Sequence, residues 1–270
     1  VLGGTVGGIL GPLLAGPMGA AARRAGLDEL SGPFGATVAL FVLAAAAIVI
    51  GLRPEPKELA AAVGGPKSAV TGPARSIREI FSTRPALVAV LAMVFGQLVM
   101  AMLMVITPLH MRQHQHPLTT ISYVISAHVV GMYGFSIFSG RLVDRWGRGP
   151  VIAAGSGILA FAALASRLSP DFVPLAGSLF LIGLGWNFCF VGGSSLLADQ
   201  LTPAERARTQ GFNDLLIGLA SAVGSLGSGL VFAAVGFGAM GVVGAAVALF
   251  LLSITAWSRA WRREAEPSIP

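Results

Sequence analysis

Charged side chains are scarce in this chain of 270 residues. Asp, Glu, Lys and Arg make up 11% of it, against about 25% in an average soluble domain. This scarcity argues against a soluble globular protein, and it excludes an intrinsically disordered chain, which needs charge and a low apolar content to stay solvated. Because 54% of the residues are apolar and the mean hydropathy is +0.79, the composition predicts a membrane protein.

Cysteines, signal-peptide features and catalytic motifs are also missing. Cys189 is the only cysteine, so the chain can form neither an intramolecular disulfide nor a cysteine-based metal site. The first residues lack a basic segment and a small-residue cleavage site, which argues against a signal peptide, and the absence of an initiator Met suggests a fragment. With no Gly-x-Ser-x-Gly, no pair of intramembrane aspartates and no phosphate loop, the sequence predicts neither an enzyme nor a cofactor.

Long segments without any charged residue are abundant. A charge at the centre of a membrane helix costs roughly 2.5 to 3.5 kcal/mol, so seven charge-free segments of 18 or more residues indicate membrane spans. The last segment, 215–258, is long enough for two helices with a turn at Gly236–Gly238. The segments are apolar all round, which predicts helices rather than barrel strands. The eight expected spans are 1–22, 34–52, 86–108, 119–140, 151–166, 172–197, 211–235 and 239–258.

The basic residues predict the orientation of these spans. Alternate loops place fourteen of the 18 Lys and Arg residues on one side of the membrane and four on the other, and short cytoplasmic loops retain positive charge. Both ends of the chain are therefore expected in the cytoplasm, with the protein in the cytoplasmic (inner) membrane. The net charge of +6 predicts attraction to the lipid bilayer, whose inner leaflet is anionic, rather than to nucleic acid.

A long loop divides the chain into unequal parts. We expect two helices in 1–52, a cytoplasmic linker in 53–84, six helices in 85–258 and a cytoplasmic tail in 259–270. The first part of the linker is rich in Pro and Gly, as flexible linkers often are. In its second part, 76–82, apolar residues recur at helical spacing, which suits either a short helix in the membrane surface or a plain solvated helix.

A pattern of glycines and charges lies between the expected spans 119–140 and 151–166. It consists of Gly140, Asp144, Arg145, Gly147 and Arg148. Gly140 allows a helix end to pack closely, Gly147 allows a tight turn, and Asp144 can accept hydrogen bonds from a helix N-terminus. A basic cytoplasmic turn would be a simpler explanation, but the position between two charge-free segments on the cytoplasmic side favours a specific motif.

This loop resembles the signature loop of the major facilitator superfamily, Gly-x-x-x-Asp-Arg-x-Gly-Arg followed by a basic residue. Gly149 replaces that last residue here, as in the second copy of the loop, between helices eight and nine of the family. The resemblance implies helices five to twelve of a twelve-helix fold: an all-α, polytopic helical bundle with about eight transmembrane helices. The first four helices of such a protein would then be missing upstream.

The first expected span has a second resemblance. Gly7, Gly11, Pro12 and Gly16 are similar to the fifth-helix motif of proton-coupled antiporters in the same family, although Ala15 stands where the family prefers Gly. Glycines four residues apart permit close helix contact, and Pro12 is expected to kink the helix. Close packing alone would also explain these glycines.

The resemblance implies secondary active transport of a small solute by alternating access between two halves. The fifth-helix motif favours proton-coupled efflux. Uptake by symport is an alternative, and a nontransporting membrane scaffold or a membrane enzyme is an alternative from another class. The implied partners are a small-molecule substrate, protons, the bilayer and the missing helices. Because no Asp, Glu, Lys or Arg lies at mid-depth in this chain, a proton-carrying carboxylate is expected in the missing half, unless the coupling differs.

Five residues are candidates for the substrate cavity: Gln97, His128, Trp186, Asn187 and Phe190. In the family the first and fourth helices of each half line the cavity, which implies the spans 86–108 and 172–197 here. Gln97 and Asn187 could face this cavity or form ordinary interhelical hydrogen bonds. His128 could bind a proton near physiological pH or stay neutral and bonded to a neighbour. Other intramembrane polar residues are Tyr123, Tyr133 and Cys189.

Three histidines lie close together in the expected outer loop, at His110, His114 and His116. Imidazoles can bind zinc or copper. However, no acid or cysteine lies nearby in the sequence, and Arg112 would repel a cation. We therefore expect an interfacial or pH-sensitive loop and no metal site.

Overall fold

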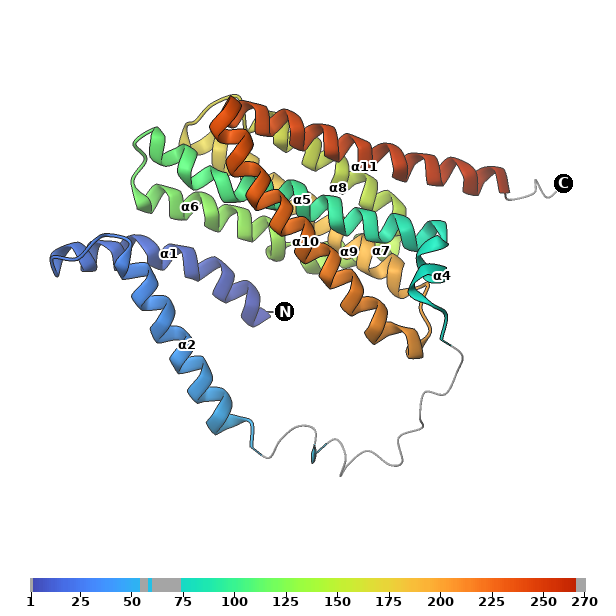
Figure 1. The fold of residues 1–270 in the computed structure, drawn as a ribbon, viewed down its shortest axis with the longest axis horizontal. Helices are drawn as coiled ribbons and strands as arrows, with labels where there is room; N and C mark the ends of the chain where they lie inside the picture. The colour runs from blue at the N-terminus through green and yellow to red at the C-terminus, as the bar shows by residue number, and fades with distance from the viewer. Residues whose placement is uncertain (1, 54–57, 60–73, 266–270) are drawn as a thin grey trace.

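All regular structure in the described residues is helical (Figure 1). The computed structural model describes residues 2–53, 58–59 and 74–265, and the side chains of residues 6–53, 58–59 and 74–257. The helices are α1 (Leu2–Arg24), α2 (Ser31–Gly51), α4 (Ile77–Ser82), α5 (Arg84–Gln113), α6 (Leu118–Val129), the π-helix η1 (Val130–Gly134), α7 (Ser136–Trp146), α8 (Arg148–Ala165), α9 (Phe172–Ala198), α10 (Pro203–Val235) and α11 (Phe237–Ala265). The prediction of an all-α fold is confirmed.

Most of the expected spans correspond to helices that can cross a membrane. Among the described residues, six helices are long and apolar enough: α2, α5, α8, α9, α10 and α11. The expected span 119–140 is a pair, α6–η1 and α7, bent by 40°, which makes a seventh if counted as one span. α1, at the position of the expected span 1–22, is helical but is not among these helices. The Pro- and Gly-rich stretch of the linker lies outside the described residues.

The helix α9 lies among α5, α6, η1, α7 and α8 and contacts all of them. Its glycines bring the backbones together: a Cβ at Gly183 would lie 2.2 Å from the carbonyl oxygen of His128 in α6. A Cβ at Gly185 would lie 2.9 Å from the carbonyl of Gly155 in α8, and one at Gly193 would lie 2.9 Å from a carbonyl of α5. Small residues allow such close approach of membrane helices, so α9 is the central helix of the bundle.

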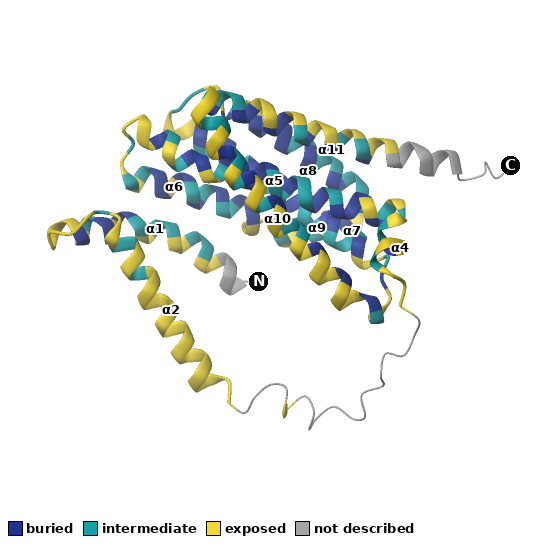
Figure 2. Ribbon diagram, viewed as in Figure 1, coloured by how far each residue is buried: buried dark blue, intermediate teal, exposed yellow. Residues whose placement is uncertain are grey.

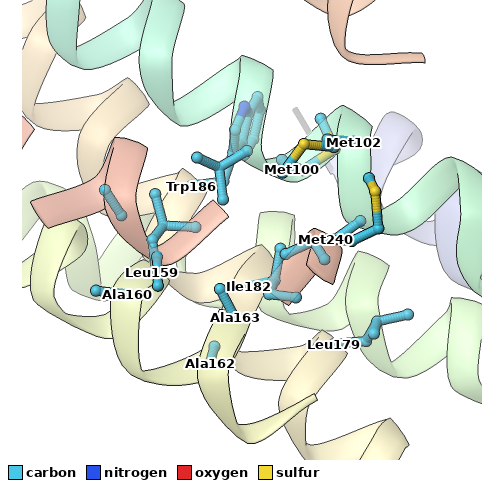
Figure 3. Packing of buried hydrophobic residues seen from close by; sticks show 14 of the residues in the cluster. Met100, Met102, Leu159, Ala160, Ala162, Ala163, Leu179, Ile182, Trp186 and Met240 are labelled. Carbon is cyan, nitrogen blue, oxygen red and sulfur yellow. The ribbon is translucent and has the colours of Figure 1, made fainter. Parts of the chain in front are cut away.

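Apolar side chains fill the space between these helices (Figure 2). Figure 3 shows Met100 of α5, Leu159 of α8, Ile182 of α9 and Met240 of α11 within one cluster. Leu159, Ile182 and Met240 have no exposed surface. The core therefore joins the helices from α5 to α11 into one bundle.

The helices α1 and α2 lie beside this bundle (Figure 1). α1 packs against α6 and α2. No residue of α2 is buried, and its large apolar side chains are exposed, as Figure 2 shows. Within the described residues, α1 therefore provides the main link between the first two helices and the bundle.

The short helix α4 packs on the bundle. It begins with a capping box, in which the Ser76 hydroxyl accepts from the Glu79 amide (3.2 Å) and a Glu79 carboxylate oxygen accepts from the Ser76 amide (2.6 Å). This backbone hydrogen bond lowers the pKa of Glu79. Ile80 is fully buried, and the ring of Phe81 lies 5.7 Å from that of Phe212 in α10. One residue of its apolar side is thus covered by protein, whereas Ile77 and Phe81 are half-buried. A location in the membrane surface and a solvated helix both stay open as predictions.

Candidate functional site

An aromatic cluster lies near the middle of α5 and α9. The indole N–H of Trp186 donates to Oε1 of Gln97 (2.8 Å), and the Trp186 ring stacks on Phe190 with 4.9 Å between centroids. Tyr133 of η1 meets Trp186 edge-on at 6.0 Å. Trp186 is buried (Figure 3), whereas Gln97 and Phe190 are half-buried and Tyr133 is 38% exposed. The structure thus brings three of the five predicted cavity residues together and adds Tyr133 to them.

This aromatic cluster retains free hydrogen-bonding groups. Within the described part of the chain, we find no partner for the amide nitrogen of Gln97 or for the hydroxyl of Tyr133. Flat aromatic faces bind planar or cationic ligands by stacking, and a few polar groups at their edge fix the orientation of the ligand. The cluster can therefore provide both kinds of contact.

Asn187 forms interhelical hydrogen bonds instead of facing a cavity. Its amide nitrogen donates to the carbonyl of Met132 (2.6 Å) and to the hydroxyl of Ser136 (3.2 Å), and its Oδ1 accepts from Ser139. Asn187 is 2% exposed. The residue therefore connects α9 to the bent span at η1, where a π-helix breaks the regular hydrogen bonding. The interhelical alternative is the one that the structure shows.

His128 is bonded to α9 and lies apart from the hydrogen bonds and ring contacts of the aromatic cluster. Its Nδ1 lies 2.9 Å from the carbonyl oxygen of Leu179, and the residue is 1% exposed. Its Nε2 has no hydrogen-bond partner in the described residues. Of the predicted cavity residues, His128 and Asn187 thus connect helices, whereas the other three form the cluster.

Gly147, in the motif that runs from Gly140 to Arg148, makes the turn that the sequence predicts. Gly147 has φ = +87°, which favours glycine, and α8 begins directly after it. Arg148 then pairs with Asp199 at the end of α9, with 2.8 Å between Nε and Oδ2. Asp199 was not predicted, because the acid that pairs with Arg148 lies 51 residues along the chain.

The acid of the motif has no such partner. Asp144 and Arg145 are exposed, and in the described part of the chain we find no hydrogen bond or ion pair from either side chain. A Cβ on Gly140 would meet no atom within 4 Å. The predicted bond from Asp144 to a helix N-terminus is therefore absent from this arrangement of helices.

The α1 motif takes part in a close contact with α6. A Cβ at Gly16 would lie 3.3 Å from Cα of Thr119, and one at Gly8 would lie 2.9 Å from Val129. The hydroxyl of Ser126 donates to a backbone carbonyl of α1 at 3.2 Å. These contacts join α1 to the first part of the bent span.

The remaining residues of that motif do not make the expected contact. A Cβ at Gly7 or at Gly11 would meet no atom within 4 Å. α1 stays helical through Pro12. The glycines of α1 that approach α6 are Gly8, Gly16 and Gly19, because the rotation of α1 turns Gly7 and Gly11 away from its partner.

Two of the three histidines in the loop after α5 contact each other, and the third lies against another loop. The ring of His110 stacks on that of Phe237 with 4.0 Å between centroids. The ring of His114 lies edge-on to the ring of His110, with 4.5 Å between centroids. Nε2 of His116 lies 3.0 Å from the carbonyl of Pro170 in the loop before α9. Among the described residues no group of three His, Cys, Asp or Glu side chains could hold a metal ion.

An acid and two arginines also meet near the end of α5, close to these histidines in the sequence. Glu29, between α1 and α2, lies 2.9 Å from Arg23 and 3.7 Å from Arg112 at the end of α5. This pairing connects the first two helices to the bundle on the side where α1 contacts α6.

A buried carboxylate anchors the linker at the opposite end. Glu205 in the first turn of α10 is 1% exposed and accepts from the Arg75 guanidinium at 2.8 and 2.9 Å and from the Arg75 amide at 2.9 Å. Arg75 also donates to the carbonyl of Gln200 (2.6 Å), and its hydrogen bond to Glu205 raises the pKa of Arg75. The sequence signal for Glu205 was the capping box with Thr202, but nothing in it indicated the arginine.

Comparison with known proteins agrees with this architecture. The family model described as Major Facilitator Superfamily matches residues 89–270. Two MFS-type transporters of Bacillus subtilis (strain 168), YdeG and YddS, both named as uncharacterized, are 34% identical over 259 residues and 33% identical over 260. Each alignment covers 94% of this chain, but only 60% and 59% of the relative.

A third relative has a more specific name. The riboflavin transporter RfnT of Brucella anthropi is 32% identical over 150 residues, which cover 56% of this chain and 38% of the relative. The chain therefore spans about 60% of the length of the two Bacillus relatives and less of this one. These relatives are named as transporters and not as enzymes. The chain is an integral membrane protein and belongs to the major facilitator superfamily.

Proposed function

We propose that this protein is a secondary active transporter of a small solute and that the aromatic cluster is the part of the substrate site that this chain contributes. The observation that supports this proposal most is that Gln97, Trp186 and Phe190 lie together near the middle of α5 and α9. Tyr133 of η1 lies beside them. Transporters bind substrates near the midplane of the bilayer. Most of the bundle interior is filled by apolar side chains, and the buried Asn187 and His128 make hydrogen bonds between helices.

The chemistry of the cluster favours a planar aromatic solute. Trp186 and Phe190 lie within 20° of parallel, so a flat ring system could extend the stack. The amide of Gln97 and the hydroxyl of Tyr133 could bond polar atoms at the edge of that ring. One relative is named a riboflavin transporter, and riboflavin has a planar ring with polar edges, so it is a suitable first probe.

For direction, the proposal is export in exchange for protons, with uptake by symport as the alternative. The glycine- and proline-containing motif of α1 supports export, since it is similar to the fifth-helix motif of antiporters. The proposal includes the predicted orientation in the inner membrane, with both ends of the chain cytoplasmic, and two halves joined by the linker 53–84. Riboflavin accumulation in inverted vesicles with an acidic interior would support export, whereas accumulation in right-side-out vesicles with an acidic exterior would support uptake.

Thiol labelling tests the location of the substrate site. Gln97→Cys and Tyr133→Cys are made separately in a Cys189→Ser background, in the protein expressed from its complete gene. Both cysteines should react with a water-soluble maleimide, and riboflavin should slow the reaction. Phe161→Cys is the control, because Phe161 is 65% exposed on the outside of α8 and should react only with lipid-soluble reagents. If positions 97 and 133 label like position 161, the proposed site is wrong.

A further inference from the structure

The two ring nitrogens of His128 have different environments. Nδ1 lies 2.9 Å from the carbonyl oxygen of Leu179. A carbonyl can only accept, so Nδ1 carries the hydrogen, and in a neutral ring the lone pair is then on Nε2. This Nε2 is buried and has no hydrogen-bond partner among the described residues. A buried polar atom without a partner is rare in folded proteins and calls for an explanation.

The surroundings of His128 contain few groups that could share a proton with it. The helices packed against α6 are α1, α5, α9 and η1, and residues 1–22, 85–111, 113–140 and 172–198 contain no Asp, Glu, Lys or Arg. The titratable side chains on these elements are Tyr123 and Tyr133 on the same bent span, Cys189 on α9, and His110, at the outer end of α5, with the neighbouring His114 and His116. The charged groups are Arg23, Arg24, Arg84 and Arg112 at helix ends. His128 is therefore the only imidazole within the bent span.

His128 also lies next to the irregular part of its helix. The π-helix η1 begins two residues after it, at Val130, and such breaks occur frequently at functional sites. The carbonyl of His128 itself faces Gly183, where a Cβ would lie only 2.2 Å away. The imidazole is thus located where the backbones of α6 and α9 touch and where the span changes direction.

Protonation of Nε2 would add an N–H donor and a positive charge at this crossing. A buried charge without a partner is strongly unfavourable. The protonated ring therefore requires water or an acceptor at Nε2, which α6 and α9 do not provide in the present arrangement. An arrangement that opens this crossing binds the proton more tightly, and by thermodynamic linkage the proton favours that arrangement.

We propose that His128 is a proton-binding site of the transport cycle, neutral in the arrangement described here and protonated when the bent span moves away from α9. This inference rests on the proposed transport function and identifies a group that couples it to protons. In each cycle one proton from water on one side binds the lone pair of Nε2, and the same proton leaves to water on the other side. The hydrogen on Nδ1 stays covalently attached to Nδ1 throughout the cycle, and no other covalent bond forms or breaks.

The first experiment separates coupling from transport. His128→Asn retains an N–H donor near the position of Nδ1 but cannot be protonated, and Tyr123→Phe, on the same helix, is the matched control. Liposomes that contain the complete protein are assayed for exchange of labelled riboflavin without a gradient and for accumulation driven by a pH gradient. We expect His128→Asn to keep exchange within about threefold of the wild type and to lose accumulation at least tenfold. Equal gradient-driven accumulation in His128→Asn and Tyr123→Phe would overturn the proposal.

The second experiment does not depend on transport. Failure of the wild type to exchange riboflavin would count against the proposed substrate, so the proton site is also tested directly by nuclear magnetic resonance of protein labelled with nitrogen-15 histidine. The His128 signals are assigned by their absence in His128→Asn and, independently, in His128→Gln. We expect the neutral form to be the Nδ1–H tautomer and a protonated form to appear between pH 8 and pH 5. A His128 ring that stays neutral over this whole range would refute the inference.

Discussion

The crossing of α6 and α9 allows a matched test of the packing described above. Gly183 and Gly177 both lie within α9, but a Cβ at Gly183 would lie 2.2 Å from the carbonyl oxygen of His128 and 2.9 Å from the amide nitrogen of Met132, whereas a Cβ at Gly177 would meet no atom within 4 Å. Gly177→Ala should therefore show only the intrinsic preference of helices for alanine, about 1 kcal/mol in favour of the variant.

Gly183→Ala should be destabilising despite the same gain in helix preference. The added methyl group must push two backbones apart by more than 1 Å to reach an ordinary contact of 3.4 Å. Overpacking of this kind costs about 1 to 3 kcal/mol. Because the gain in helix preference is the same in both variants, it cancels, and they should differ in unfolding free energy by about 1 to 3 kcal/mol. This is roughly a 5-fold to 150-fold difference in the unfolding equilibrium.

The unfolding of both variants can be followed through a single thiol. Cys189 is the only cysteine and has no exposed surface, so it should react with a fluorogenic maleimide only when the bundle opens. Unfolding is measured in detergent micelles with increasing dodecyl sulfate. Gly131→Ala should repeat the result from the partner helix, since a Cβ there would lie 2.2 Å from the carbonyl of Phe180. If Gly183→Ala is as stable as Gly177→Ala, the backbones of α6 and α9 are not in contact and the reasoning fails.

Three further predictions concern the charged groups. Glu205→Gln should free the end of the linker, because the neutral amide holds the Arg75 guanidinium less firmly. Trypsin should then cut after Arg75 faster than in the wild type. Equal cleavage rates would contradict the anchoring of the linker by Glu205. A double-mutant cycle of Glu29→Gln and Arg112→Gln should give a coupling free energy of less than about 1 kcal/mol that falls with added salt, since the pair is partly exposed and 3.7 Å apart. A coupling free energy of several kcal/mol would contradict this prediction. Asp144→Asn should leave stability unchanged, because the carboxylate has no partner among the residues that the structure describes. The variant should nevertheless slow transport at least tenfold if Asp144 acts in another arrangement of helices. Transport at the wild-type rate in that variant would reduce the loop to a topology signal.

The sequence alone was sufficient for the class of fold and for most of the membrane spans. Lipid offers no hydrogen bonds to the backbone, so a long charge-free segment must form a helix, and its length can be read directly from the residues. The break between α10 and α11 was predictable for the same local reason, since Gly236 has φ = +80°. The motif from Gly140 to Arg148 was also visible, because its turn at Gly147 depends on residues next to one another in the chain.

The contacts of individual side chains were decided only by the tertiary structure. Arg75 bonds to Glu205, which lies 130 residues along the chain. The amide of Asn187 bonds to the backbone carbonyl of Met132, which lies in the π-helix η1. In the same way, Gly8 and Gly16 approach α6 while Gly7 and Gly11 do not. The physical reason is that these helices are apolar on every side. Their sequences specify that they cross the membrane, but they have no amphipathic face to indicate how each helix is rotated or which neighbour it meets.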